Sequence, residues 1–219
     1  MRLTASDGHE FDAYEVHPDG AGAAVVIVQE IFGVNAHIRS VVDTYAALGY
    51  RAIAPALFDR VEPDVELDYD DAGIEQGREM AGQIAFESAM LDVAAAVRAV
   101  SATGPVAVIG YCYGGSLAWL AADGLPVAAA IGYYGGQIIG MIDHEPKVPT
   151  MLHFGELDHA IPLDGVQQIA DAHPSVPVHV YAGAGHGFNC DARGSFEPLS
   201  ATIARGRTVE FLLDAGVRP

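Results

Sequence analysis

The chain has 219 residues, of which 51% are hydrophobic, and its formal net charge is −18. A surface this acidic repels phosphate backbones, so the composition argues against nucleic-acid binding. No apolar run reaches the length of about 20 residues that a membrane-spanning helix needs, and residues 1–10 contain no apolar stretch typical of a secretory signal. We therefore expect a cytoplasmic protein with no membrane partner and a single domain over residues 1–219.

Apolar segments alternate with helical segments along the chain. This pattern is typical of an α/β protein with a mostly parallel sheet and helices on both faces. Strands are expected at 11–17, 23–29, 51–55, 106–110, 128–133, 150–154 and 178–181. Helices are expected at 36–48, 73–100, 114–122, 164–172 and 197–215, with an acidic, solvated loop at 59–71.

The strongest local motif is Gly-Tyr-Cys-Tyr-Gly-Gly at 110–115, which follows an apolar strand and precedes an expected helix. This is the context of a nucleophile elbow, with Cys112 in the place of the usual serine. A side chain at Gly110 or Gly114 would collide with backbone in so tight a turn. The N-terminus of the following helix would favour a thiolate, and the N–H of Tyr113 would point at the reacting carbonyl oxygen. The alternative is a small buried cysteine in a glycine-rich turn.

A nucleophile elbow predicts that an acid and then a histidine follow later strands. Asp158 comes after the strand at 150–154, and His186 lies in a glycine-rich loop after the strand at 178–181. His186 would take the thiol proton and return it to the leaving group, while Asp158 would orient the imidazole and stabilise its charged form.

The chain has nine histidines, and we expect most of them to have no catalytic role. Core packing is the simpler interpretation for His153 and His179, which lie on expected strands. His159 adjoins Asp158 and could line the site. Surface positions are expected for His9, His17, His144 and His173.

The strand at 23–29 ends in Gln-Glu-Ile-Phe-Gly-Val-Asn at 29–35. In a fold with a nucleophile elbow this loop supplies the second backbone donor of the oxyanion hole, and Ile31 is the expected donor. Glu30 lies beside it, and a helix cap or a surface salt bridge is the alternative to a role in the reaction.

Five motifs occur in order along nearly the whole chain: 29–35, 110–115, Gly-Tyr-Tyr-Gly at 132–135, Gly-Glu-Leu-Asp at 155–158 and Gly-His-Gly-Phe at 185–188. Together they resemble the dienelactone hydrolase family (carboxymethylenebutenolidases). The resemblance implies an α/β-hydrolase fold, a small lactone or ester substrate, and no metal or cofactor.

The resemblance also implies residue roles. Cys112 would attack the substrate carbonyl and form an acyl-thioester, with Asp158 and His186 completing a triad. Glu30 would contact the resting thiol and help to generate the thiolate when substrate binds.

Members of this family that hydrolyse dienelactone hold its carboxylate with two arginines, one of them a few residues after the histidine. Cys190 stands at about that position here, and Arg193 is the nearest substitute. Arg78 is the candidate for the other arginine, with Arg60 as second choice. A disulfide between Cys112 and Cys190 is not expected in an intracellular protein.

Two other functions remain open at this point. One is a small-ligand-binding protein that keeps the fold without catalysis. The other is a cysteine amidase or peptidase, although such folds do not usually require the acid and then the histidine to follow the nucleophile.

Overall fold

The computed structural model describes all 219 residues. Its sheet has eight strands in the order β1-β2-β4-β3-β5-β6-β7-β8. The strands are β1 (Arg2–Thr4), β2 (Glu10–Val16), β3 (Ala24–Val28), β4 (Arg51–Pro55), β5 (Val106–Tyr111), β6 (Ala129–Tyr133), β7 (Thr150–Gly155) and β8 (Val178–Tyr181). Strand β2 pairs antiparallel with both of its neighbours, β1 and β4, and all the other neighbouring strands pair parallel. The predicted mostly parallel sheet is confirmed, with β1 as an additional strand.

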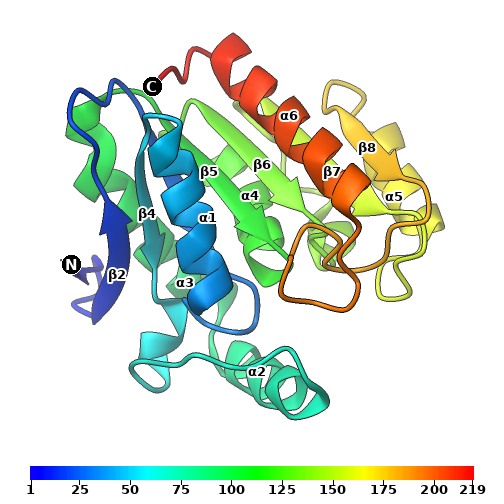
Figure 1. Ribbon diagram of the computed structural model, residues 1–219, viewed down its shortest axis with the longest axis horizontal. Helices are drawn as coiled ribbons and strands as arrows, with labels where there is room; N and C mark the ends of the chain where they lie inside the picture. The colour runs from blue at the N-terminus through cyan, green and yellow to red at the C-terminus, as the bar shows by residue number, and fades with distance from the viewer.

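Six α-helices connect and cover these strands. They are α1 (Ala36–Ala47), α2 (Asp71–Gln83), α3 (Phe86–Val100), α4 (Tyr113–Gly124), α5 (Leu163–Ala172) and α6 (Pro198–Asp214). Helices α1 and α6 cover one face of the sheet, and α3 and α4 cover the other (Figure 1). None of the helices combines the length and the apolar character needed to cross a membrane.

The central strand β3 shows why a continuous apolar run predicts a buried parallel strand. Successive side chains of a strand point to opposite faces. Val25 and Ile27 accordingly pack in the core with residues of α1 and α6, whereas Val26 and Val28 pack in the core with residues of α3 and α4. Each of these side chains is fully buried, which stabilises the fold by about 1.5–3 kcal/mol per side chain.

The single helix predicted over 73–100 is wrong, because the chain forms two helices there. Ile84 ends α2 with an extended backbone, φ −109° and ψ 113°. Its side chain is buried in the same core as residues of α3. The break lets α2 leave the sheet and cross the loop that follows β3, where a Cβ on Gly77 would stand only 1.9 Å from the carbonyl oxygen of Ile31. No proline marks the break, so the sequence shows only one long helical pattern.

The surface position expected for His173 is also wrong. His173 ends α5 and is buried. Its Nε2–H donates to the carbonyl of Ile142 at 2.7 Å, and its ring packs edge-on against Trp119 with a centroid distance of 4.9 Å. His153 is fully buried on β7, so its predicted core position is confirmed.

Candidate active site

Cys112 stands at the tip of the turn between β5 and α4. Its backbone has φ 53° and ψ −111°, a conformation that non-glycine residues rarely adopt. The turn closes tightly because a Cβ on Gly110 would be 1.8 Å from the carbonyl oxygen of Gly114. The structure therefore has the strand–turn–helix geometry expected for a nucleophile elbow, and Cys112 is partly exposed at its tip.

The structure brings Asp158 and His186 to the same place, from the loops after β7 and β8. The Nε2 atom of His186 is 3.2 Å from the Sγ atom of Cys112, and its Nδ1 atom is 2.7 Å from an oxygen of Asp158. The other oxygen of Asp158 accepts the backbone N–H of Ala160 at 2.9 Å. The histidine thus bridges the thiol and a buried, oriented carboxylate.

The environment of His186 favours its protonated form. Burial disfavours the imidazolium, but hydrogen bonds to Asp158 and Cys112 and the charges of both groups outweigh it and raise the pKa of His186 to about 10. A raised pKa means that the imidazole readily accepts a proton at neutral pH. The geometry is suited to a thiolate–imidazolium pair.

The two predicted oxyanion donors flank Cys112. The N–H of Ile31 donates no hydrogen bond within the protein, and Ile31 lines the same cavity as Cys112. Tyr113 is the first residue of α4, where backbone N–H groups have no acceptor inside the helix. Both N–H groups are therefore free for an oxygen of a bound molecule.

Glu30 is fully buried, and its carboxylate is hydrogen-bonded to neither sulfur nor backbone. The hydroxyl of Tyr69 donates to one carboxylate oxygen at 3.0 Å, and Nη1 of Arg193 donates to the other at 3.3 Å. Glu30 is therefore held by Tyr69 and Arg193 rather than by the thiol of Cys112.

The three candidate arginines have different surroundings. Arg193 is largely buried, and its guanidinium also lies 5.5 Å from the ring centroid of Phe32. Arg78 is exposed on α2 and lines the cavity of Cys112 together with Arg193. Arg60 instead forms a two-pronged ion pair with the buried Asp92 at 2.7 Å, which makes it a structural residue.

A cavity of about 580 Å³ opens above Cys112. His159 lines this cavity, as its position next to Asp158 suggested. His186 and Asp158 line it as well. The cavity accommodates a small molecule and places it between Cys112 and the arginines. The candidate site is therefore a pocket with a thiol at its base and two guanidinium groups on its wall.

Two tyrosines of the site were not predicted. Tyr134 has φ 39°, and its ring lies 5.2 Å from that of His186, so it forms a wall behind the imidazole. Tyr69 belongs to the acidic segment that was predicted to be solvated, yet it reaches Glu30. Tyr134 belongs to the Gly-Tyr-Tyr-Gly motif that carried the resemblance, whereas nothing in the sequence near Tyr69 distinguishes it from a surface residue.

Comparison with known proteins shows the family of the chain. Residues 11–215 match the model of the dienelactone hydrolase family. A carboxymethylenebutenolidase of Pseudomonas putida is 36% identical over 223 residues, covering 97% of this chain and 94% of the relative. Carboxymethylenebutenolidase 1 of Cupriavidus pinatubonensis is 31% identical, covering 97% of this chain and 95% of the relative.

The chain belongs to the dienelactone hydrolase family. The predicted family, the α/β-hydrolase fold and the assignment as a hydrolase of ester or lactone bonds are thereby confirmed.

Solved structures agree with the fold. A crystal structure from Klebsiella pneumoniae, provisionally named a dienelactone hydrolase, has a TM-score of 0.83 and 27% identity, covering 96% of this chain and 97% of that chain. A dienelactone hydrolase-like promiscuous phosphotriesterase from metagenomic libraries has a TM-score of 0.73 at 20% identity, covering 99% of this chain and 97% of that chain, and supports the fold alone.

The tight turn predicts a difference between two glycines of the same helix. A Cβ on Gly114 would be 2.3 Å from the carbonyl oxygen of Val28, whereas a Cβ on Gly124 would meet nothing within 4 Å. We expect Gly114→Ala to lower the free energy of unfolding by about 2–3 kcal/mol and Gly124→Ala to leave it unchanged or raise it by up to about 1 kcal/mol. Denaturant midpoints measure both effects, and equal midpoints for the two variants would contradict the steric argument.

Proposed function

We propose that the protein is a cysteine-dependent hydrolase of a small lactone or ester, with Cys112, His186 and Asp158 as its catalytic triad. The observation that carries this proposal is the unbroken chain of contacts from the Cys112 sulfur through both nitrogens of His186 to Asp158, at 3.2 and 2.7 Å. The reaction needs no cofactor and no metal in this mechanism.

In the first half of the reaction the Cys112 sulfur attacks the substrate carbonyl carbon. The thiol proton passes to Nε2 of His186, and the carbonyl oxygen becomes an oxyanion held by the N–H groups of Ile31 and Tyr113. The carbon–oxygen single bond then breaks, and the imidazolium gives its proton to the departing alkoxide. The product is an acyl-thioester, to which the alcohol stays attached if the substrate was a lactone.

In the second half a water molecule attacks the thioester carbonyl. His186 takes the proton from this water, and the same two N–H groups hold the second oxyanion. The carbon–sulfur bond breaks, the imidazolium returns its proton to the departing thiolate, and the carboxylic acid leaves. Asp158 keeps the imidazole oriented and stabilises its charged form in both halves.

The arginines support a substrate that carries a carboxylate. Arg78 and Arg193 line the cavity, and a guanidinium binds a carboxylate with charge-assisted hydrogen bonds. The relatives from Pseudomonas putida and Cupriavidus pinatubonensis are named carboxymethylenebutenolidases, that is, hydrolases of a carboxymethylene-substituted butenolide, which is an anionic lactone. We propose this class of substrate for the pocket.

Glu30 links the pocket to the thiol in this proposal. In the substrate-free protein its carboxylate is neutralised by Arg193. A substrate carboxylate that pairs with Arg193 competes with Glu30 for the guanidinium. Glu30 then becomes a buried carboxylate without its cation and a stronger base, so it takes the Cys112 proton transiently before that proton reaches Nε2 of His186.

Removing the nucleophile should abolish turnover. We expect Cys112→Ala and His186→Ala to lower kcat for an activated aryl ester by about 10³-fold or more, with the fold retained by circular dichroism. His144→Ala is the matched control, because His144 pairs with Asp123 at the surface, and it should keep full activity. Mass spectrometry of quenched wild-type protein should show an acyl group on Cys112.

The same assay separates the other functions. Undiminished ester turnover in Cys112→Ala contradicts the mechanism. Inactivity of the wild type on ester and lactone panels, with a small ligand still bound, indicates a binding protein. Preference for peptides over esters indicates an amidase or peptidase.

The arginines should matter only for anionic substrates. We expect Arg78→Gln and Arg193→Gln to lower kcat/KM for a carboxylate-bearing ester by about tenfold to a hundredfold relative to its methyl ester, the loss of one charge-assisted hydrogen bond. Arg205→Gln, outside this cavity, is the control. An unchanged ratio between the two substrates in both variants would refute the proposed carboxylate site.

Glu30 should make the thiol sensitive to a bound anion. The test uses a carboxylate that is small enough to leave Cys112 uncovered. We expect this anion to accelerate the alkylation of Cys112 by iodoacetamide severalfold at neutral pH in the wild type. The acceleration should be absent in Glu30→Gln and preserved in Glu87→Gln, an exposed residue of α3. Equal acceleration in Glu30→Gln would show that Glu30 plays no part in activating the thiol.

A further inference from the structure

A second cluster of reactive side chains lies next to the catalytic cavity. It consists of Glu30, His37 and Cys190, which come from the loop after β3, the start of α1 and the loop after His186. All three are buried, and their ligand atoms lie within 4.8 Å of one another. Neither His37 nor Cys190 has a role in the mechanism described above.

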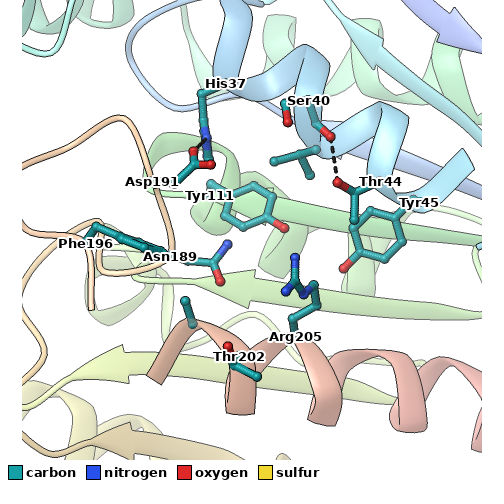
Figure 2. A pocket seen from close by; sticks show the side chains of 12 residues that line it. His37, Ser40, Thr44, Tyr45, Tyr111, Asn189, Asp191, Phe196, Thr202 and Arg205 are labelled. Carbon is teal, nitrogen blue, oxygen red and sulfur yellow. Dashed lines mark hydrogen bonds and ion pairs between the residues drawn. The ribbon is translucent and has the colours of Figure 1, made fainter. Parts of the chain in front are cut away.

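His37 carries an unpaired nitrogen inside the protein. Its Nδ1–H donates to the carboxylate of Asp191 at 2.9 Å (Figure 2), so in the neutral ring the lone pair is on Nε2. This Nε2 atom is buried and has no hydrogen-bond partner. The whole side chain is only 5% exposed. Leaving a buried acceptor unpaired costs about 1–3 kcal/mol, so such an atom indicates a missing partner.

The pair formed by Asp191 and His37 has the form of a metal-binding histidine. Histidines that bind metals commonly donate their other ring N–H to a carboxylate, which fixes the ring and makes the free nitrogen more basic. The side chain of Asp191 is 67% exposed. Its one hydrogen bond is the one to His37, so its evident role is to orient that ring.

Cys190 is fully buried. Burial, followed by the charge of Glu30, raises the pKa of its thiol to about 12. A thiol gives up its proton when its sulfur binds a metal ion, so Cys190 can act as a negatively charged ligand.

We propose that Glu30, His37 and Cys190 form a binding site for a thiophilic divalent cation such as Zn²⁺. Thiolate sulfur, imidazole nitrogen and carboxylate oxygen are the ligands that Zn²⁺ prefers. Bond lengths of about 2.0–2.3 Å place tetrahedral ligand atoms roughly 3.5 Å apart, so ligand atoms that now lie within 4.8 Å of one another need to approach by at most about 1.3 Å. The fourth position is left to solvent.

The charges around the cluster allow such an ion. Glu30 supplies one negative charge, now shared with Arg193, and the thiol of Cys190 supplies a second when it loses its proton. Two negative ligands and a neutral imidazole balance a divalent cation. The net charge of −18 also concentrates cations at the protein surface.

A second cavity reaches the His37 side of the cluster. His37 and Asp191 line a separate cavity of about 110 Å³ between α1 and α6. Figure 2 shows Asn189 and Arg205 projecting into the same cavity from the side opposite α1. An ion can therefore approach His37 without passing the catalytic cavity, which is lined by Arg193 and Cys112 instead.

Cobalt titration tests the site, and since it measures binding alone, its outcome is independent of the proposed ester hydrolysis. The protein carries Cys112→Ser, so that Cys190 is the remaining thiol. We expect chelator-treated protein to bind one Co²⁺ with a thiolate-to-cobalt charge-transfer band, and Zn²⁺ to displace it. The band should disappear in Cys190→Ser, and Co²⁺ affinity should fall by about 10–100-fold in Asp191→Asn.

Asp191→Asn changes an exposed side chain and tests the site even if variants of buried ligands fail to fold. His144→Gln is the matched control, because His144 also pairs with an aspartate but has no cysteine beside it, and it should bind Co²⁺ like the parent. Absence of the band in the Cys112→Ser protein, its persistence in Cys190→Ser, or unchanged affinity in Asp191→Asn would each overturn the proposal.

Discussion

The close packing of α4 against the ends of β3 and β5 is the constraint on which the candidate site depends. The N–H of Gly114 donates to the carbonyl of Gln29 at 3.0 Å, and no side chain fits between them. One contact therefore fixes two things: Cys112 at the start of α4 and Ile31 two residues after Gln29. The thiol and the backbone donor are positioned together because they share this contact, and not through contacts of their own side chains.

The same contact places a carboxylate where a charge is costly. Glu30 follows Gln29 directly and is fully buried. A buried carboxylate needs a cation or several hydrogen bonds, and the protein meets this need with Arg193 and Tyr69. Because Arg193 also faces the catalytic cavity, any anion that enters there alters how Glu30 is compensated. A cation that enters from the side of His37 would alter it too. Glu30 is thus the point at which the two cavities can influence each other.

Local sequence was enough to predict the strands and turns that carry the candidate catalytic residues Cys112, Asp158 and His186. Gly110 and Gly114 imply the tight turn sterically, and Asp158 and His186 were found because each follows a predicted strand, in the order that the elbow requires. Contacts between distant segments could not be predicted in this way. Tyr69 reaches Glu30 from an acidic loop whose composition indicates solvent, and His37 meets Cys190 only because α1 and the loop after β8 meet in the folded chain. The break at Ile84 arises from burial against the sheet, which helix periodicity does not register.

The residues proposed for the reaction and those proposed for substrate selectivity lie on helices that differ in burial. Helix α4 buries most of its residues, whereas α2 buries only Gly73, Gly77 and Met80. The proposed nucleophile therefore stands on a helix that is rigidly packed, and Arg78 stands on one that is held mainly by close backbone approaches. Elements with few buried apolar contacts open locally at lower cost. If Arg78 binds substrate and Cys112 is the nucleophile, as proposed, substitutions in α2 change which substrate is bound without disturbing the elbow.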